Sequence, residues 1–226
     1  MLTLLFSPKW FYGIDIAFEI ISIIVALLIS FYSYKLYTIS KKKEHKYFHI
    51  FFLMIAIAFV FKIMTNFDLY FDVLQTMQIG SIQVQYISKS LSTIYRFGGL
   101  FMYRLLTAMF AYGLYMLVNK KRDRRDLLLF TYFIIVLAFL SYYGYFLFHL
   151  TMVMLLGFVS YYYYINCKKL HTINSRLVAS GFIMLTLANV VFAVVELDLV
   201  LYVLAEVLQL AGFCLLLGAF ISVIRK

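Results

Sequence analysis

No charged residue interrupts the 41 residues from Leu127 to Cys167, which read LLLFTYFIIVLAFLSYYGYFLFHLTMVMLLGFVSYYYYINC. At a helical rise of about 1.5 Å per residue, this stretch would be about 60 Å long. A spanning helix needs about 20 apolar residues, because the hydrocarbon layer of a bilayer is roughly 30 Å thick. The stretch therefore predicts two crossings joined by a tight turn, which we expect near Phe148 to Thr151.

Clusters of Lys and Arg flank this stretch and recur along the chain, with long apolar segments between them. Four clusters hold 15 of the 20 Lys and Arg residues. Basic residues next to membrane spans are retained on the cytoplasmic side, so all four clusters are expected to face the cytoplasm. They are Lys35 with Lys41, Lys42, Lys43 and Lys46; Lys120 with Lys121, Arg122, Arg124 and Arg125; Lys168 with Lys169 and Arg176; and Arg225 with Lys226.

The composition of the 226 residues requires lipid as the surrounding solvent. Apolar residues make up 65% of the chain and aromatic residues 20%, and the mean hydropathy is +0.95. A soluble domain of this size could not bury that much apolar surface. The net charge of +10 could suggest nucleic acid, but the excess lies in the four basic clusters. We read it as a topology signal that also favours anionic lipid, and we expect no nucleic-acid partner.

The apolar segments predict an all-α integral membrane protein, a seven-transmembrane-helix bundle that forms a single polytopic domain over residues 1–226. With the basic clusters inside, the N-terminus lies outside and the C-terminus is cytoplasmic, as in a multi-pass protein of the cell membrane. We expect residues 67–92 to form an outer loop, in which the alternation of Ile82 to Tyr86 is typical of a strand. The spans are expected at about 11–37, 47–66, 93–119, 127–147, 151–167, 175–195 and 201–224.

Ionisable residues inside four of these spans lie at one predicted depth. Glu19, Lys62, Arg104 and Glu206 are each 15 or 16 residues from the cytoplasmic boundary of their span. That separation corresponds to about 22 to 24 Å at helical rise, which is in the outer part of the bilayer. Each ionised side chain within a membrane costs roughly 2.5 to 3.5 kcal/mol even on the lower insertion scale. These groups are therefore expected to face one another or water.

Helical spacing places further polar residues on the same faces as these four, which defines a candidate binding layer. One interpretation is a structural ion-pair network in which Lys62 and Arg104 extend toward the interface. The other is a pocket open to the outside, where Arg104 and Lys62 hold an anionic group and Glu19 or Glu206 holds a cation or a proton. The candidate binding residues are Asp15, Glu19, Lys62, Arg96, Arg104, Asn189, Glu206 and Gln209.

Motifs for catalysis or metal binding are not recognisable in the sequence. It contains no nucleophile elbow, Gly-rich phosphate loop or zinc motif, so we expect neither an enzyme nor a cofactor. His45 and His49 lie one helical turn apart, but without a third ligand they are more simply interfacial histidines. His149 is expected at a loop tip. The small residues Ala205 and Gly212 predict close helix packing. We expect this packing inside the bundle in preference to a contact between two copies of the chain.

Three functions remain open on the sequence. The first is a receptor-type module that binds a ligand from outside and signals through a separate cytoplasmic or membrane protein partner. The second is a transporter or channel subunit for a small solute or ion, and the third is a non-catalytic subunit of a membrane complex; an oligomer is possible in each case. A carrier predicts a polar track to the cytoplasm, whereas a receptor predicts a sealed inner half. The single proline, Pro8, precedes the first span, so the helices are expected to be uninterrupted.

Overall fold

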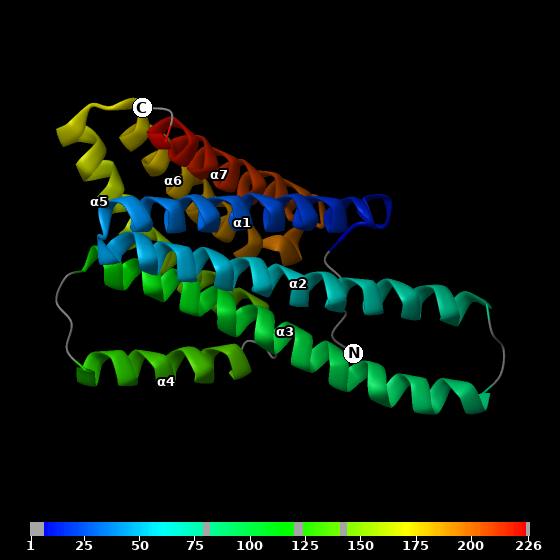
Figure 1. Ribbon diagram of the computed structural model, residues 1–226. Coiled ribbons are helices and arrows are strands. Elements are labelled where there is room, and N and C mark those ends of the chain that lie inside the picture. Colours follow the sequence, from blue (N-terminus) through cyan, green and yellow to red (C-terminus); the bar gives the residue numbers. More distant parts are fainter. Residues whose placement is uncertain (1–6, 79–81, 120–123, 141–143, 225–226) are drawn as a thin grey trace.

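The computed structural model describes residues 7–78, 82–119, 124–140 and 144–224, and these residues are helical apart from short connections (Figure 1). Six of the helices are long and apolar enough to cross a bilayer, which confirms the predicted helical membrane architecture in outline. Two short 3₁₀ helices, at Lys9–Phe11 and Val195–Leu197, precede α1 and α7. The α-helices are α1 (Ile14–Ser40), α2 (Lys43–Gln78), α3 (Ile82–Val118), α4 (Arg124–Leu140), α5 (Tyr145–Leu170), α6 (Ile173–Ala193) and α7 (Val200–Ile224).

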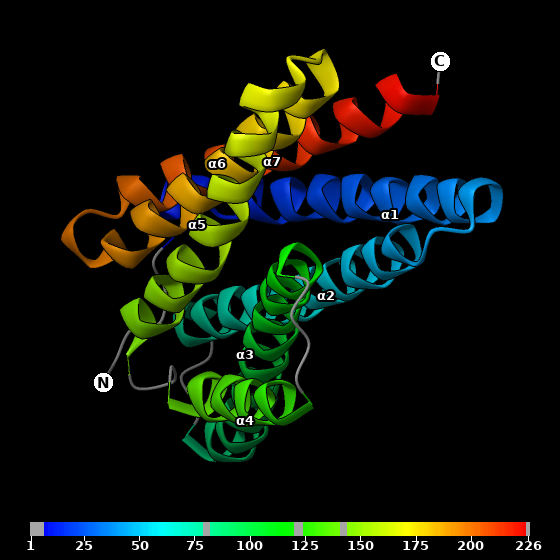
Figure 2. The same ribbon diagram turned by 90° about the vertical axis from the view of Figure 1, so that its left-hand side faces the viewer.

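Six helices form a closed ring, and the seventh lies outside it. Around the ring, α1 packs on α2, α2 on α3, α3 on α5, α5 on α6, α6 on α7, and α7 returns to α1. The remaining helix, α4, packs mainly on α3 and only slightly on α5. Figures 1 and 2 place α4 at the edge of the molecule beside α3. The ring therefore consists of the six helices that are long enough to span a bilayer.

Tight turns within the basic clusters join two pairs of neighbouring helices. Lys41 caps the C-terminus of α1. Its φ of 55° is left-handed, and its N–H donates to Tyr37 O at 2.8 Å. Helix α5 ends in the same way at His171, with φ of 50° and an N–H bond to Cys167 O at 3.0 Å. A left-handed residue after the last turn satisfies a helix carbonyl and reverses the chain. Thr172 then caps α6 by accepting a hydrogen bond from Ser175 N.

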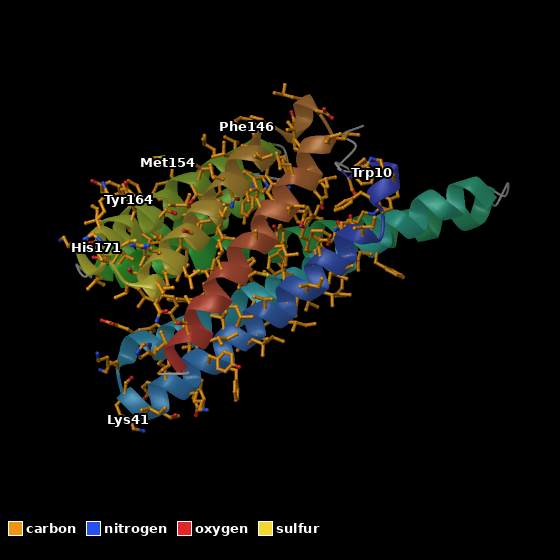
Figure 3. The ribbon with its side chains drawn as sticks, turned by 90° about the horizontal axis from the view of Figure 1, so that it is seen from above. Trp10, Lys41, Phe146, Met154, Tyr164 and His171 are labelled. Atoms are coloured by element: carbon orange, nitrogen blue, oxygen red, sulfur yellow. The ribbon has the colours of Figure 1, made fainter. Side chains whose placement is uncertain are left out.

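Both of these turns lie at one end of the bundle. Figure 1 shows the α1–α2 connection, the α5–α6 connection and the C-terminal end of α7 at the same end. Figure 3 labels Lys41 and His171 there, and Trp10 and Phe146 toward the other end. We call the end with Lys41 and His171 the basic end and the other the opposite end.

The connection expected over residues 67–92 is helical in the part that the structure describes, so the strand-like reading of Ile82 to Tyr86 is wrong. Helix α2 continues to Gln78 and α3 begins at Ile82, so the residues expected to alternate as a strand are helical; residues 79–81 lie outside the described part. Each residue added to an existing helix gains a hydrogen bond without a new nucleation cost. This gain is larger than the preference of five alternating residues for a strand. With 36 and 37 residues, α2 and α3 are about 55 Å long. They project beyond the rest of the bundle at the opposite end (Figure 1).

The turn expected near residues 148–151 is also wrong. Helix α4 ends at Leu140 and α5 begins at Tyr145, so Phe148 and His149 lie in the first turns of α5, where both are buried. The 17 residues of α4 and the 26 of α5 divide the stretch unequally. Length alone predicts a turn near the midpoint, whereas the two described helices end at Leu140 and begin at Tyr145, after Gly144, which is extended at φ −141°.

Close backbone packing joins α6 to α7. A Cβ on Gly181 would lie 3.0 Å from Gly212 O, and a Cβ on Gly212 would lie 3.0 Å from Gly181 O. Each would also come within 3.0 Å of a leucine side chain on the facing helix. Ala205 on α7 is buried as well. The small residues of α7 thus serve packing inside the bundle, as their spacing predicted.

Candidate functional site

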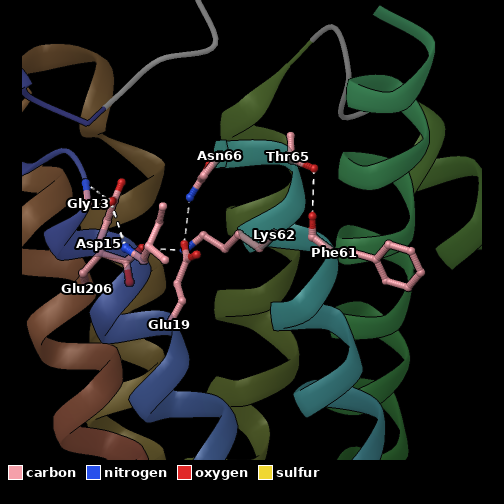
Figure 4. Close-up of polar contacts among 9 residues, drawn as sticks. Gly13, Asp15, Glu19, Phe61, Lys62, Thr65, Asn66 and Glu206 are labelled. Carbon is pink, nitrogen blue, oxygen red and sulfur yellow. Dashed lines mark hydrogen bonds and ion pairs between the residues drawn. The ribbon is translucent and has the colours of Figure 1, made fainter. Parts of the chain in front are cut away.

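A buried ammonium group between two carboxylates forms the centre of the candidate site. Lys62 Nζ on α2 lies 3.0 Å from Glu19 Oε1 on α1 and 2.5 Å from Glu206 Oε1 on α7 (Figure 4). Glu19 is 0% exposed, Glu206 2% and Lys62 7%. We call these three residues the Lys62 cluster. Because they come from three helices, the cluster ties α1, α2 and α7 together.

The two oxygens of Glu19 have different surroundings. Oε1 accepts hydrogen bonds from Lys62 and from Asn66 Nδ2, the latter at 2.9 Å. Asn66 lies one helical turn beyond Lys62, so both donors are on one face of α2. Oε2 is buried and has no hydrogen-bond partner among the residues that the structure describes. The donors thus converge on one oxygen of this carboxyl group.

Aromatic rings enclose the ammonium group on the remaining sides. Lys62 Nζ lies 5.7 Å from the ring centre of Tyr103, 5.7 Å from that of Phe192 and 5.8 Å from that of Tyr202. A cation over an aromatic face is attracted by about 2 kcal/mol or more when it is desolvated. These rings come from α3, α6 and α7. Side chains from four of the other five ring helices therefore touch or face Lys62.

Arg104 is buried against a different helix. It is 2% exposed, and its guanidinium carbon lies 5.8 Å from the ring centre of Tyr145 and 5.9 Å from that of Phe148, both on α5. The structure contains the ion pairs of the first interpretation, between Lys62 and the two glutamates, but Lys62 and Arg104 lie inside the bundle and do not extend toward the membrane interface. Burial among rings holds both cations within the protein.

The remaining acidic and amide residues of the predicted layer have contacts of their own. Asp15 is fully buried and its Oδ1 accepts from the backbone N–H groups of Gly13 and Ile16, at 3.0 and 2.8 Å, as at a helix N-terminus. Arg96, on α3, is partly exposed. Gln209 is buried one turn from Glu206, and its Nε2 has no hydrogen-bond partner within the described part of the chain.

Asn189 contacts a histidine that the sequence analysis had placed at a loop tip. His149 Nδ1 lies 2.9 Å from Asn189 Oδ1, while Asn189 Nδ2 donates to Leu185 O at 2.9 Å. Because the amide nitrogen is used on Leu185, we assign the proton to His149 Nδ1. The ring of His149 stacks on Phe192, which also faces Lys62. The buried helical face that includes Phe148, His149 and Met152 was the signal that could have found this residue.

The interior between the Lys62 cluster and the basic end holds a core of apolar side chains, with Ser22, Thr107 and Gln209 buried beside the cluster. Phe59 and Phe213 meet edge to face with ring centres 5.6 Å apart, and Phe52 and Phe110 meet in the same way at 5.3 Å. Ile29 of α1 is also fully buried in this core. We call these five residues the apolar layer. Because close-packed rings leave little room for water, the apolar layer separates the cluster from the basic end.

Polar groups reappear on the basic side of the apolar layer. Ser30 Oγ lies 2.8 Å from His49 Nδ1, and it also donates to His49 O at 3.0 Å. Ser33, one turn further along α1, is fully buried. His49 is therefore engaged with α1. Within the described residues, no three His, Cys, Asp or Glu side chains lie close enough together to hold a metal ion.

The structure brings Glu19, Lys62 and Glu206 into direct contact, and it surrounds them with aromatic groups that the sequence analysis had not assigned to the site. Comparison with known proteins adds no family: no protein-family model, no curated protein and no solved structure matches this chain. The chemistry of the Lys62 cluster is therefore the guide to function.

Proposed function

We propose that this chain is a seven-span protein of the cell membrane whose Lys62 cluster is a binding site on the outer side, and that binding is signalled through a separate cytoplasmic or membrane partner. The observation that carries this proposal is the contact of one buried ammonium group with carboxylates from two other helices. A change of charge or occupancy there acts on α1, α2 and α7 at once. Such a site is suited to changing how helices pack.

The position of the basic clusters supports the orientation. Lys41 and His171 mark the two described turns at the basic end, and the C-terminal end of α7 lies there too (Figures 1 and 3). Basic loops favour the cytoplasmic side, so the opposite end, with Trp10, is the outer end. This orientation places the Lys62 cluster nearer the outside.

The path of the chain supports α4 as the seventh crossing. Helix α3 ends at the basic end, whereas α5 begins toward the opposite end and returns (Figure 1). The chain must therefore run the length of the bundle between them, and α4 lies along that path. Its 17 residues would extend about 25 Å. That length is near the lower limit for a spanning helix.

The energetic cost of the cluster favours function over scaffolding. Replacing a buried ion pair by well-packed apolar residues is often neutral or stabilising, so a charged group of three is a poor device for holding a bundle together. Ionisable residues within membrane segments are functional by default for the same reason. The burial of all three side chains makes this argument apply to the Lys62 cluster.

The apolar layer favours sensing over transport. A carrier needs a polar route on both sides of its site, whereas Phe59, Phe213 and Ile29 close the interior below the cluster. The six long helices also run without a proline, and carriers commonly use interrupted helices at their site. Ion or solute transport stays the second candidate because Ser30, Ser33 and His49 provide polar groups beyond the apolar layer.

The single tryptophan offers a direct test of binding. The ring of Trp10 lies 5.5 Å from that of Phe11, which packs on Tyr202, one of the rings around Lys62. With the full chain in lipid vesicles, we expect Trp10 fluorescence to respond to protons, sodium ions or inorganic phosphate added outside. The midpoint or size of the response should change in Lys62→Met, with helix content checked by circular dichroism. An unresponsive wild type, or an equal response in Lys62→Met, contradicts the proposal, and flux of the same ions across the vesicle favours transport.

A further inference from the structure

We propose that the Lys62 cluster holds one exchangeable proton, carried on Glu19 Oε2, so that the ligand of this site is the proton itself. This inference rests on the proposed binding function and names its ligand. When the proton leaves, Glu19 becomes a carboxylate and the cluster gains one negative charge. No other bond is made or broken.

The charge count of the cluster provides the first argument. One ammonium group contacts two carboxyl groups, so full ionisation would leave a net charge of −1 on three buried side chains. The two contacting oxygens share one nitrogen at 2.5 and 3.0 Å. Two carboxyl groups that share a site cannot both ionise easily, because like charges repel and little water is present to screen them. One added proton makes the cluster neutral.

The hydrogen-bond pattern identifies Glu19 as the carrier. Both carboxyl groups contact Lys62, but of the two only Glu19 has a buried oxygen without a partner among the described residues. Glu19 accepts both of its hydrogen bonds on Oε1, while Oε2 is buried with no partner among the described residues. A carboxylate would leave half of its charge on an oxygen without a donor, which is costly in an apolar environment. With the proton on Oε2, Oε1 keeps the carbonyl character that accepts from Lys62 and Asn66.

Other titratable groups around the cluster set how tightly the proton is held. Asp15 lies one turn from Glu19 on the same helix, and Arg104 is a buried cation on α3. Helix α6 presents Phe192, which does not titrate. The titratable and charged groups near the cluster are Asp15 and Glu19 on α1, Lys62 on α2, Tyr103 and Arg104 on α3, Tyr145 and His149 on α5, and Tyr202 and Glu206 on α7.

Infrared difference spectroscopy on the full chain in lipid vesicles tests the proton directly. In potassium chloride at neutral pH, we expect the carbonyl band of a protonated carboxylic acid, which shifts in D₂O and disappears at high pH. Glu19→Gln should remove the band. The control Glu196→Gln should keep it, because Glu196 is an exposed carboxyl group outside the Lys62 cluster. Absence of the band from the wild type, or its persistence in Glu19→Gln, overturns the proposal.

Two further variants test the charge count and the assignment to Glu19. Lys62→Met should strengthen the band, because both carboxyl groups then become neutral. Asn66→Leu removes a hydrogen bond from Glu19 Oε1 and should move the band to higher frequency; an unmoved band would place the proton on Glu206 and overturn the assignment. If sodium chloride abolishes the wild-type band at constant pH, the ligand is a sodium ion and the proposal is wrong.

The proposed function and the proton fail in different experiments. A Trp10 response to phosphate or sodium without any protonated-acid band would leave the binding site standing and remove the proton. A band with the expected variant pattern but no Trp10 response would establish the proton at Glu19 and remove the sensing function. The fluorescence measurement thus tests the binding function, and the infrared measurement tests the proton on Glu19.

Discussion

The two halves of the bundle interior are built by opposite means. Toward the opposite end, side chains from four helices surround the ammonium group of Lys62, through two carboxylates and three aromatic rings. Toward the basic end, the apolar layer holds the same helices together by ring packing, and α6 meets α7 through facing glycines. Charge is sensitive to ions and pH, whereas close packing is not. The comparison teaches that packing toward the opposite end depends on charge, whereas packing toward the basic end depends on close apolar contact.

Removing the ammonium group should have the largest effect. Lys62→Met leaves two buried carboxyl groups without their shared partner, and breaking such a pair costs about 4 kcal/mol. The loss should be largest at high pH, where both carboxyl groups ionise, and smaller at low pH, where protons neutralise them. Thermal unfolding in lipid nanodiscs across the pH range measures it. An equal loss of stability at every pH would show that the half of the bundle toward the opposite end is also held together by packing.

Truncating the apolar layer should cost somewhat less and show no pH dependence. Phe59→Ala removes a ring that is 1% exposed and packs on Phe213. A cavity of this kind costs about 3 kcal/mol, because the removed contacts are not replaced. The same unfolding measurement should give one loss at all pH values. A pH-dependent loss would show that the apolar layer is coupled to the charged groups above it.

Filling the glycine contact between α6 and α7 should cost about 2 kcal/mol. Gly181→Ala places a methyl group 2.8 Å from Leu216 Cγ and 3.0 Å from Gly212 O, so the helices must separate. Gly218→Ala on α7 is the matched control, since a Cβ there meets nothing within 4 Å. The midpoint of thermal unfolding compares the two. Equal midpoints would mean that close backbone approach does not stabilise the half of the bundle toward the basic end.

Replacing Glu19 by Gln should have the smallest effect on stability. Gln has the shape of the neutral acid, so the contacts with Lys62 and Asn66 survive and the change should be under about 1 kcal/mol. The variant should also lose the pH dependence of wild-type unfolding over the range where Glu19 exchanges its proton. A loss comparable with that of Lys62→Met would show that Glu19 is an ionised partner of the pair.

The sequence predicted this molecule best where hydropathy and helical rise determine the answer. Counting residues from the basic boundaries placed Glu19, Lys62 and Glu206 at one depth, because helices that cross the same slab have nearly the same length scale. Counting residues could not predict that Lys62 contacts both carboxylates or that Arg104 packs on α5. These contacts depend on the rotation of each helix about its axis.

The errors fell where the membrane gives no length constraint. The continuation of α2 and α3 as helices past residue 67 could not be read from hydropathy, because segments outside the bilayer need not be apolar. His149 was misplaced because the turn was set at the middle of a stretch that the chain divides unequally. A buried histidine beside Asn189 depends on a partner that is distant in the sequence.

Because α2 extends beyond the bundle, a small tilt of this helix at Lys62 moves its far end by a larger distance. Lys62 lies 16 residues before Gln78, the last residue of α2, and that distance is about 24 Å along a helix. A rigid helix of that length converts a tilt of about 10° at Lys62 into a displacement of about 4 Å at its tip. If a change of charge in the Lys62 cluster tilts α2, the end of α2 at Gln78 moves by more than a bond length.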